Sequence, residues 1–186
     1  DPALGPGWKD PAGSGRPPRR RSPSPSMDPS SPRACLLRKA VEHQPRKTLP
    51  LELNKVASAW PQARVQGTEV AEVRQEYEAL SSLIKQCSPS ASATWLAATV
   101  HSLTKLGSRD PLFWRDLRPV RDDLIAHLCG RLTEPTVLRS SLGKDLALVL
   151  WSLAKLGTRT PAWIAALEQR LLQEELLASL SPQSVS

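Results

Sequence analysis

Two segments of the chain, 50 residues apart, carry the same pattern. Residues 91–114 read ASATWLAATVHSLTKLGSRDPLFW and residues 141–164 read SLGKDLALVLWSLAKLGTRTPAWI, with nine identical positions out of 24. From Ser102 to Pro111 the shared pattern is S-L-x-K-L-G-x-R-x-P, which is seven matches in ten. Internal repeats of this length are typical of proteins built by stacking one supersecondary unit on the next. The repeat therefore constrains the fold more tightly than any other feature of the sequence.

Each copy predicts a hairpin of two helices. Its first half places apolar residues on one helix face, in a stripe that both copies share: Leu96, Val100 and Leu103, then Leu146, Leu150 and Leu153. Gly107 and Gly157 are expected to end these helices as left-handed C′ residues. A capping residue and a proline then open a second helix in both copies, at Asp110-Pro111 and Thr160-Pro161.

The second helix of the first copy contains a proline, which distinguishes it from the other copy. Pro119 is expected to divide it into a short helix from Pro111 to Leu117 and another from about Val120 to Leu132, because an internal proline removes a helix hydrogen bond. Gly130 is expected to terminate the latter. In the second copy the second helix should continue with one apolar face as far as Leu180, a face formed by Trp163, Ile164, Leu167, Leu171, Leu172, Leu176 and Leu180.

These patterns predict an all-α fold, an α-solenoid of about three stacked hairpins, preceded by a disordered or extended basic tail. The domain boundaries that we expect are a tail at 1–49, a repeat domain at 50–186, a divergent hairpin at 50–88, repeats at about 88–134 and 137–180, and the opening of a further repeat at 181–186. An array that stops there exposes apolar surface, so we expect a fragment or a covering partner.

The tail prediction rests on charge and proline content. Residues 1–50 hold ten Lys or Arg against four Asp or Glu, and eleven of the eighteen prolines. Such a segment buries too little apolar surface to offset the entropy of ordering it. Its charge suits nucleic acid, an anionic membrane surface or an acidic protein, and a solvated linker is the alternative. From Met27 onward it also has the composition of an organellar transit peptide, or of an ordinary basic tail.

The sequence contains no pattern for catalysis, metal binding or a membrane span. Three sparse cysteines make no disulfide framework and indicate a reducing compartment. His127 and Cys129 would point to different sides of a helix, and no phosphate loop or zinc spacing is present. We therefore predict a protein that is not an enzyme, with no cofactor, metal, membrane span or small-molecule substrate. Trp114, Trp151 and Trp163 are expected to pack between helices, with His101 partly buried at the repeat position of Trp151.

The second copy resembles the octotricopeptide repeat family, organellar RNA-binding α-solenoid proteins related to heptatricopeptide and RAP-type repeat proteins. Leu150 to Gly157, LWSLAKLG, matches the family's first helix, and Pro161-Ala162-Trp163 matches the opening of its second. The first copy has His101 and Thr104 where the family has tryptophan and alanine. The repeat spacing is also longer than the family's usual period. The resemblance covers about residues 88–186 and implies RNA as the ligand.

On this basis we expect a non-catalytic RNA-binding or RNA-scaffolding protein of an organelle, with a mitochondrion favoured over a plastid. It would act in RNA processing or stability, or as a structural component of a mitochondrial ribosome, beside neighbouring proteins of a ribonucleoprotein complex. The alternative is a scaffold that binds a partner subunit. Candidate RNA contacts are the tail arginines, the residues that open each first helix and the cations of the turns: Arg16, Arg19, Arg20, Arg21, Ser92, Thr94, Lys144, Lys105, Arg109, Lys155 and Arg159.

Overall fold

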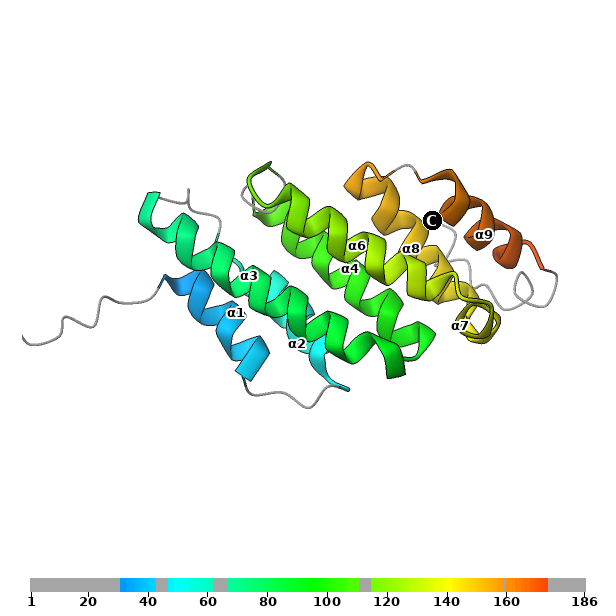
Figure 1. Cartoon of the computed structure of the whole chain (residues 1–186), viewed down its shortest axis with the longest axis horizontal. Helices are drawn as coiled ribbons and strands as arrows, with labels where there is room; N and C mark the ends of the chain where they lie inside the picture. Colours follow the sequence, from blue (N-terminus) through cyan, green and yellow to red (C-terminus); the bar gives the residue numbers. More distant parts are fainter. Residues whose placement is uncertain (1–30, 43–46, 62–66, 111–114, 159, 174–186) are drawn as a thin grey trace, which may run out of the picture.

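The structure is a computed structural model that describes residues 31–42, 47–61, 67–110, 115–158 and 160–173. Over these ranges the chain forms α-helices and one 3-10 turn and contains no strand, which confirms the all-helical class (Figure 1). In chain order the elements are α1 (Pro32–Glu42), α2 (Leu49–Ala59), α3 (Gly67–Cys87), η1 (Ser88–Ser90), α4 (Ala93–Arg109), α6 (Arg118–Leu132), α7 (Pro135–Ser140), α8 (Gly143–Leu156) and α9 (Pro161–Leu171).

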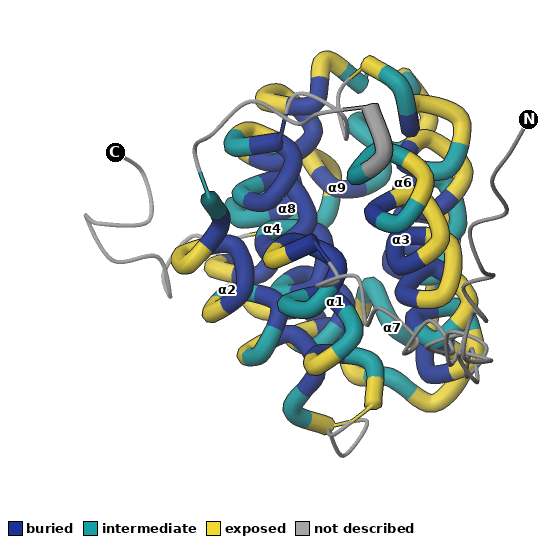
Figure 2. The backbone as a smooth tube through the Cα atoms, turned by 90° about the vertical axis from the view of Figure 1, so that its left-hand side faces the viewer, coloured by how far each residue is buried: buried dark blue, intermediate teal, exposed yellow. Residues whose placement is uncertain are grey.

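The helices pack in two rows. One row contains α2, α4 and α8, with α4 in the middle, and the other contains α1, α3 and α6. Figure 2, which looks along the molecule, shows α2, α4 and α8 on one side and α3 and α6 on the other, with the buried backbone between them. The short α7 packs against α4, α6 and α9, and α9 packs against α8.

Each row follows its own register. In the first row, Ser102 Oγ on α4 donates to the carbonyl of Pro50, 52 residues earlier, and Thr94 Oγ1 donates to Asp145 on α8, 51 residues later. In the second row the separation is shorter: Arg38 pairs with Glu76 and Lys85 with Asp123, each 38 residues later, and Arg33 pairs with Glu69, 36 residues later. The first-row register is close to the 50-residue spacing of the two sequence copies.

The predicted apolar stripes form the core. Leu96, Val100 and Leu103 are fully buried, and in the second copy Leu146 and Leu153 are buried while Leu150 is partly buried. On α9, Leu167 is buried and Trp163 packs partly buried against the same core. Leu172, expected on that buried face, is 68% exposed, because α9 ends at Leu171. The predicted continuation to Leu180 lies outside the described residues.

Most prolines in the described part of the chain stand where helices begin. Pro50, Pro119, Pro135 and Pro161 each occupy the first turn of a helix, where an amide hydrogen has no intrahelical acceptor and its loss costs little. The break expected at Pro119 is therefore the start of α6 at Arg118. Part of the shorter helix predicted before it, at 111–114, lies outside the described residues.

The equivalent glycines of the two copies differ. Gly157 has a φ of 65° and ends α8, with its amide donating to Ala154 and that of Thr158 donating to Leu153, the paired bonds of a Schellman motif. The prediction for Gly107 is wrong: it lies buried inside α4, which continues to Arg109. The Gly130 prediction is also wrong, since α6 continues to Leu132.

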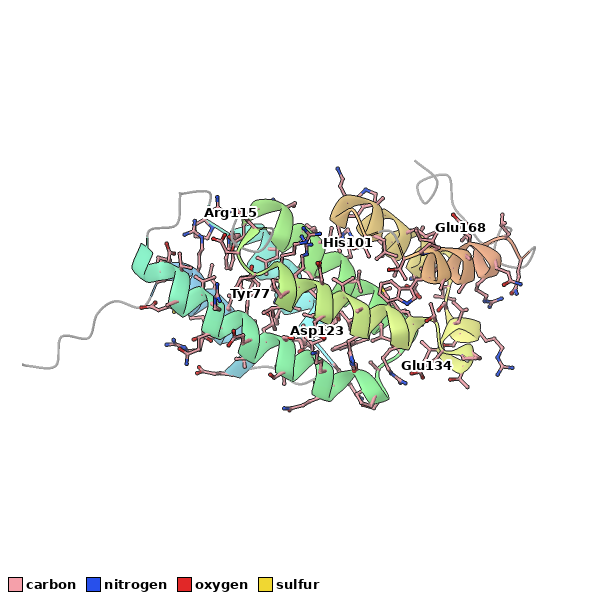
Figure 3. The ribbon with its side chains drawn as sticks, turned by 45° about the horizontal axis from the view of Figure 1, so that its top comes forward. Tyr77, His101, Arg115, Asp123, Glu134 and Glu168 are labelled. Carbon is pink, nitrogen blue, oxygen red and sulfur yellow. The ribbon has the colours of Figure 1, made fainter. Side chains whose placement is uncertain are left out.

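A buried polar contact at the end of α4 explains the longer helix. The Asp110 amide donates to the Leu106 carbonyl, which extends α4 beyond Gly107. The phenol of Tyr77, on α3, donates to Asp110 Oδ2 at 3.3 Å, and Figure 3 shows Tyr77 inside the molecule. Burial first, and then the charge of Asp110, raise the pKa of Tyr77 well above its usual value, so the phenol keeps the proton that it donates.

The helical region also begins earlier than the predicted boundary at residue 50. Helix α1 lies within the segment predicted as tail, and its residues Ala34, Leu37 and Ala40 are buried. Arg33 pairs with Glu69 at 2.7 Å, on α3. This difference arises because an apolar period of three residues and a row of glutamates on α3 stabilise a helix that proline and charge content alone did not predict.

The two glycines provide a matched test of the fold. Replacing Gly157 by alanine is expected to destabilise the protein by about 1 kcal/mol, because a side chain disfavours the left-handed backbone there. Gly130→Ala is expected to stabilise it by roughly 0.5 kcal/mol, since Gly130 lies in a helix and a Cβ there meets no atom within 4 Å. Urea unfolding of both variants measures the difference; the same sign for both would contradict the assigned backbone.

Candidate nucleic-acid interface

A groove of about 920 Å³ opens on the outer side of the first row. Helices α2 and α4 form its two walls, with η1 at one end and Leu148 of α8 at the edge. Apolar and cationic side chains line it, among them Lys47, Leu51, Trp95, His101 and Lys105, and none of its described lining residues is acidic. A surface of this composition can hold a negatively charged ligand that also has a flat or apolar part.

Two of the candidate RNA contacts, Ser92 and Thr94, lie in this groove at the start of α4. Ser92 is the N-cap of α4, and its hydroxyl accepts from the Trp95 amide at 3.2 Å. Thr94 donates to Asp145 Oδ2 at 2.9 Å, and that carboxylate is 2% exposed at the first turn of α8. Both hydroxyls thus have a role inside the protein that the sequence pattern did not reveal.

The turn cations of the first copy contact α2. Lys105 Nζ donates to Asn54 Oδ1 at 2.7 Å and remains at the groove wall. Arg109 donates to the carbonyls of Ala57 and Ser58, at 2.6 and 2.8 Å. Carbonyls in the last turn of a helix have no intrahelical donor, so a guanidinium there satisfies them and complements the helix dipole. Arg109 is therefore engaged in joining α4 to α2.

The cations of the second copy face outward. Lys144 and Lys155 are exposed, and Lys155 Nζ lies 5.7 Å from the centroid of the Trp151 ring. The remaining candidates, Arg16, Arg19, Arg20, Arg21 and Arg159, lie outside the described residues. The described positions thus place Ser92, Thr94 and Lys105 together in the groove, with Lys144 and Lys155 on the neighbouring helix.

Trp151 corrects a prediction, because it does not pack in the core: 45% of its surface is exposed. The buried residues of α8 include Val149 and Leu153, and a helix turns by 100° per residue, which directs residue 151 to the opposite side. Its ring packs against His101 of α4, with centroids 5.1 Å apart and planes at 50°. Figure 3 labels His101 beside α8. Trp114 lies outside the described residues.

Leu51, on α2, faces another side of its helix than the buried residues Leu53 and Val56. The structure buries Leu53 and Val56 but leaves Leu51 55% exposed at the groove. Leu51 and Leu53 are two positions apart and therefore project from different sides of α2. In the sequence, the two-residue spacing of Leu51 and Leu53 indicates that Leu51 lies away from the core. The position of Trp151 outside the leucine stripe of its helix indicates the same for the indole.

The two rows differ in charge. The charged residues within α4 and α8 are Lys105, Arg109, Lys144, Lys155 and one acid, the buried Asp145. Helix α3 of the other row carries four glutamates against one arginine and one lysine. The outer face of α4 and α8 therefore attracts anions, whereas on α3 two of the glutamates, Glu69 and Glu76, pair with arginines of α1.

His101 is held in its neutral form. Burial first, and then the positive charge of Lys105, lower its pKa from the usual value. Its Nδ1 atom is buried without a hydrogen-bond partner. A neutral imidazole fits the packing against Trp151, because a charged ring between apolar neighbours and a lysine would cost more free energy.

Another histidine contact, away from the groove, joins Ser88 Oγ to His127 Nε2 at 2.6 Å. Ser88 is fully buried and its hydroxyl also lies 3.0 Å from the Lys85 carbonyl, so it connects η1 to α6. The nearby Cys129 thiol is buried, which raises its pKa to about 12. Among the described residues no group of three potential ligands converges on a metal position, and none of the described helices could cross a membrane.

Comparison with known proteins found no match to a family model, to a curated protein or to a solved structure. The resemblance to octotricopeptide repeats therefore stays a prediction that rests on the residues quoted for it.

Substitutions of Arg109 and Lys144 compare a cation that joins two helices with a cation that is exposed to solvent. We expect Arg109→Met to destabilise the protein by about 2 kcal/mol, because it leaves the last carbonyls of α2 without their charged donor. Lys144→Met should change stability by less than about 0.5 kcal/mol, since Lys144 is exposed. Urea unfolding of each variant measures both values, and equal effects would contradict the capping role of Arg109.

Stability is expected to fall on acidification, in part through His101. Its folded pKa lies below the unfolded value of roughly 6.5, so its contribution is present above that pH and is lost as the pH falls through the folded pKa. Unfolding midpoints measured from pH 7.5 down to about 5 should drop less for His101→Phe than for the unaltered chain. His127, whose pKa is also lowered, provides a separate contribution and the comparison variant His127→Gln. A pH profile unchanged by His101→Phe would contradict the burial of this imidazole.

Proposed function

We propose that this chain is a non-catalytic helical-repeat protein that binds or scaffolds RNA on the outer face of α2, α4 and α8. The observation that carries the proposal is the composition of this face. It combines a groove of about 920 Å³ with lysines on α4 and α8, and the only acid in those two helices is buried. A cationic surface without exposed acids is favourable for a polyanion.

The arrangement of the helices supports an α-solenoid of hairpins. Contacts in the first row recur between residues 51 or 52 apart, from Pro50 to Ser102 and from Thr94 to Asp145. A solenoid has this property because each unit contacts only its neighbours. Stacking units in this way aligns the first helices into one continuous surface, which is the kind of surface that an extended RNA strand can follow.

The candidate cations for phosphate contacts lie on α4, on α8 and in the N-terminal segment. Lys105 at the groove wall and Lys144 and Lys155 on α8 are placed to meet phosphates. The proposal includes an electrostatic contribution from Arg16, Arg19, Arg20 and Arg21, which lie outside the described residues. It also includes an organellar setting, a mitochondrion before a plastid, in RNA processing, RNA stability or a mitochondrial ribosome, for which the family resemblance is the support.

A second candidate function is a protein–protein scaffold. Leu51, Trp95 and Leu148 give the groove an apolar part, and Leu51 is 55% exposed. An apolar groove between helices can hold the apolar face of a partner helix. The lysines and the absence of acids in the described lining favour a polyanion over such a helix.

Salt dependence tests the RNA proposal. The affinity of the chain for an unstructured labelled RNA should fall with salt by about 0.7 log units per log unit of salt for each phosphate contacted. The double variant Lys144→Gln/Lys155→Gln should reduce this slope by up to about 1.4, whereas Arg74→Gln/Lys85→Gln, on α3, should leave it unchanged. A flat salt response, or no retention on RNA, would contradict RNA binding and favour the scaffold.

A further inference from the structure

We infer that Trp151, together with His101 and Lys155, forms a stacking position for one unpaired nucleobase, so that the ligand of this face is single-stranded RNA. The inference rests on the proposed function and adds the class of RNA. No motif in the sequence assigns this position, because the repeat pattern places Trp151 at a conventional packing site between helices.

The position of the indole is the first argument. A tryptophan that is 45% exposed on a helix face opposite its buried residues adds little to the core of this chain. The exposed part of the indole lies one helical turn from Leu148, a residue that lines the groove. Stacking on an exposed aromatic ring is the usual way in which proteins hold the bases of single strands.

The neighbours of the ring provide the second argument. His101 packs against Trp151 with ring centroids 5.1 Å apart, which restrains the indole before a ligand arrives. A restrained ring loses less conformational entropy on binding than a mobile one. Lys155 Nζ lies over the ring, 5.7 Å from its centroid, so a base that stacks on the indole displaces this flexible ammonium group toward the phosphates of the same strand.

The geometry of nucleic acids decides between single and double strands. In a duplex the faces of the bases are stacked on each other and only the ends expose one, so an indole on a helix surface cannot reach them. In a single strand each base can turn out and stack. An apolar partner helix would also cover Trp151, but Lys155 over the ring and the absence of exposed acids on α4 and α8 favour the polyanion.

Two substitutions at Trp151 distinguish the effect of aromatic stacking from the effect of apolar side-chain volume. Trp151→Phe keeps an aromatic ring, and Trp151→Leu keeps apolar volume without one. Leu172→Ala, at an exposed position on another part of the chain, is the matched control. Each full-length variant is titrated against three labelled probes: an unstructured mixed-sequence RNA strand, a long duplex of the same sequence, and an abasic ribose-phosphate strand of equal length. Thermal unfolding of each variant verifies that the fold is intact.

We expect Trp151→Leu to weaken binding of the unstructured strand by roughly 5- to 150-fold, the range for losing one stacked base, and Trp151→Phe to weaken it only a few-fold. Both variants should bind the duplex and the abasic strand as the unaltered chain does, because those probes are held by charge alone. Leu172→Ala should bind all three probes normally.

The other outcomes overturn the inference in distinguishable ways. If the unaltered chain binds RNA but Trp151→Leu has no effect, weakens duplex and strand equally, or behaves as Trp151→Phe does, the stacking site is wrong while the proposed function stands. If the unaltered chain binds none of the three probes, the proposed function fails and the inference fails with it. Binding of an acidic or apolar peptide in that case would identify the groove as a protein-binding surface.

Discussion

Polar contacts between helices one repeat apart hold the row of α2, α4 and α8 in register. Arg109 at the end of α4 donates to the last carbonyls of α2, and Thr94 at its beginning donates to the buried Asp145 of α8. Leucine stripes alone would tolerate a slip along the helix axis, because apolar contacts are not directional. These directional contacts prevent that slip, and α2 and α4, held together in this way, form the two walls of the groove.

The two rows of helices differ in how their charged side chains are paired. In the second row, arginines of α1 and a lysine of α3 form ion pairs with carboxylates of the next helix in that row. These charges are therefore paired within the protein. In the first row, Lys144 and Lys155 remain exposed. Most of the chain's charge of +7 belongs to residues 1–50, so the cationic character of this face comes from where its lysines lie and not from a large net charge of the helices.

Particular residues show which helix bounds follow from the local sequence and which depend on distant contacts. The proline positions and the leucine stripes predicted α4, α6 and α8 within a few residues, and the start of α9, because these signals act locally. The stop at Gly157 was predicted and the equivalent stop at Gly107 was wrong, although their surrounding sequences match. The difference comes from distant residues: Asp110 meets Tyr77, and Arg109 meets α2, so α4 continues. The helix α1 was missed for the same reason, since its partner Glu69 lies on α3.

The amino-acid pattern was therefore sufficient for the helical class and for the prolines that open α6 and α9, because those depend on neighbours within one or two turns. The candidate interface depended on tertiary packing. The side-by-side placement of α4 and α8 brings His101 to Trp151, and the packing of α2 beside α4 forms the groove that both helices line. Helical periodicity shows which residues share a face, but which face stays uncovered depends on helices that lie 50 residues away in the chain.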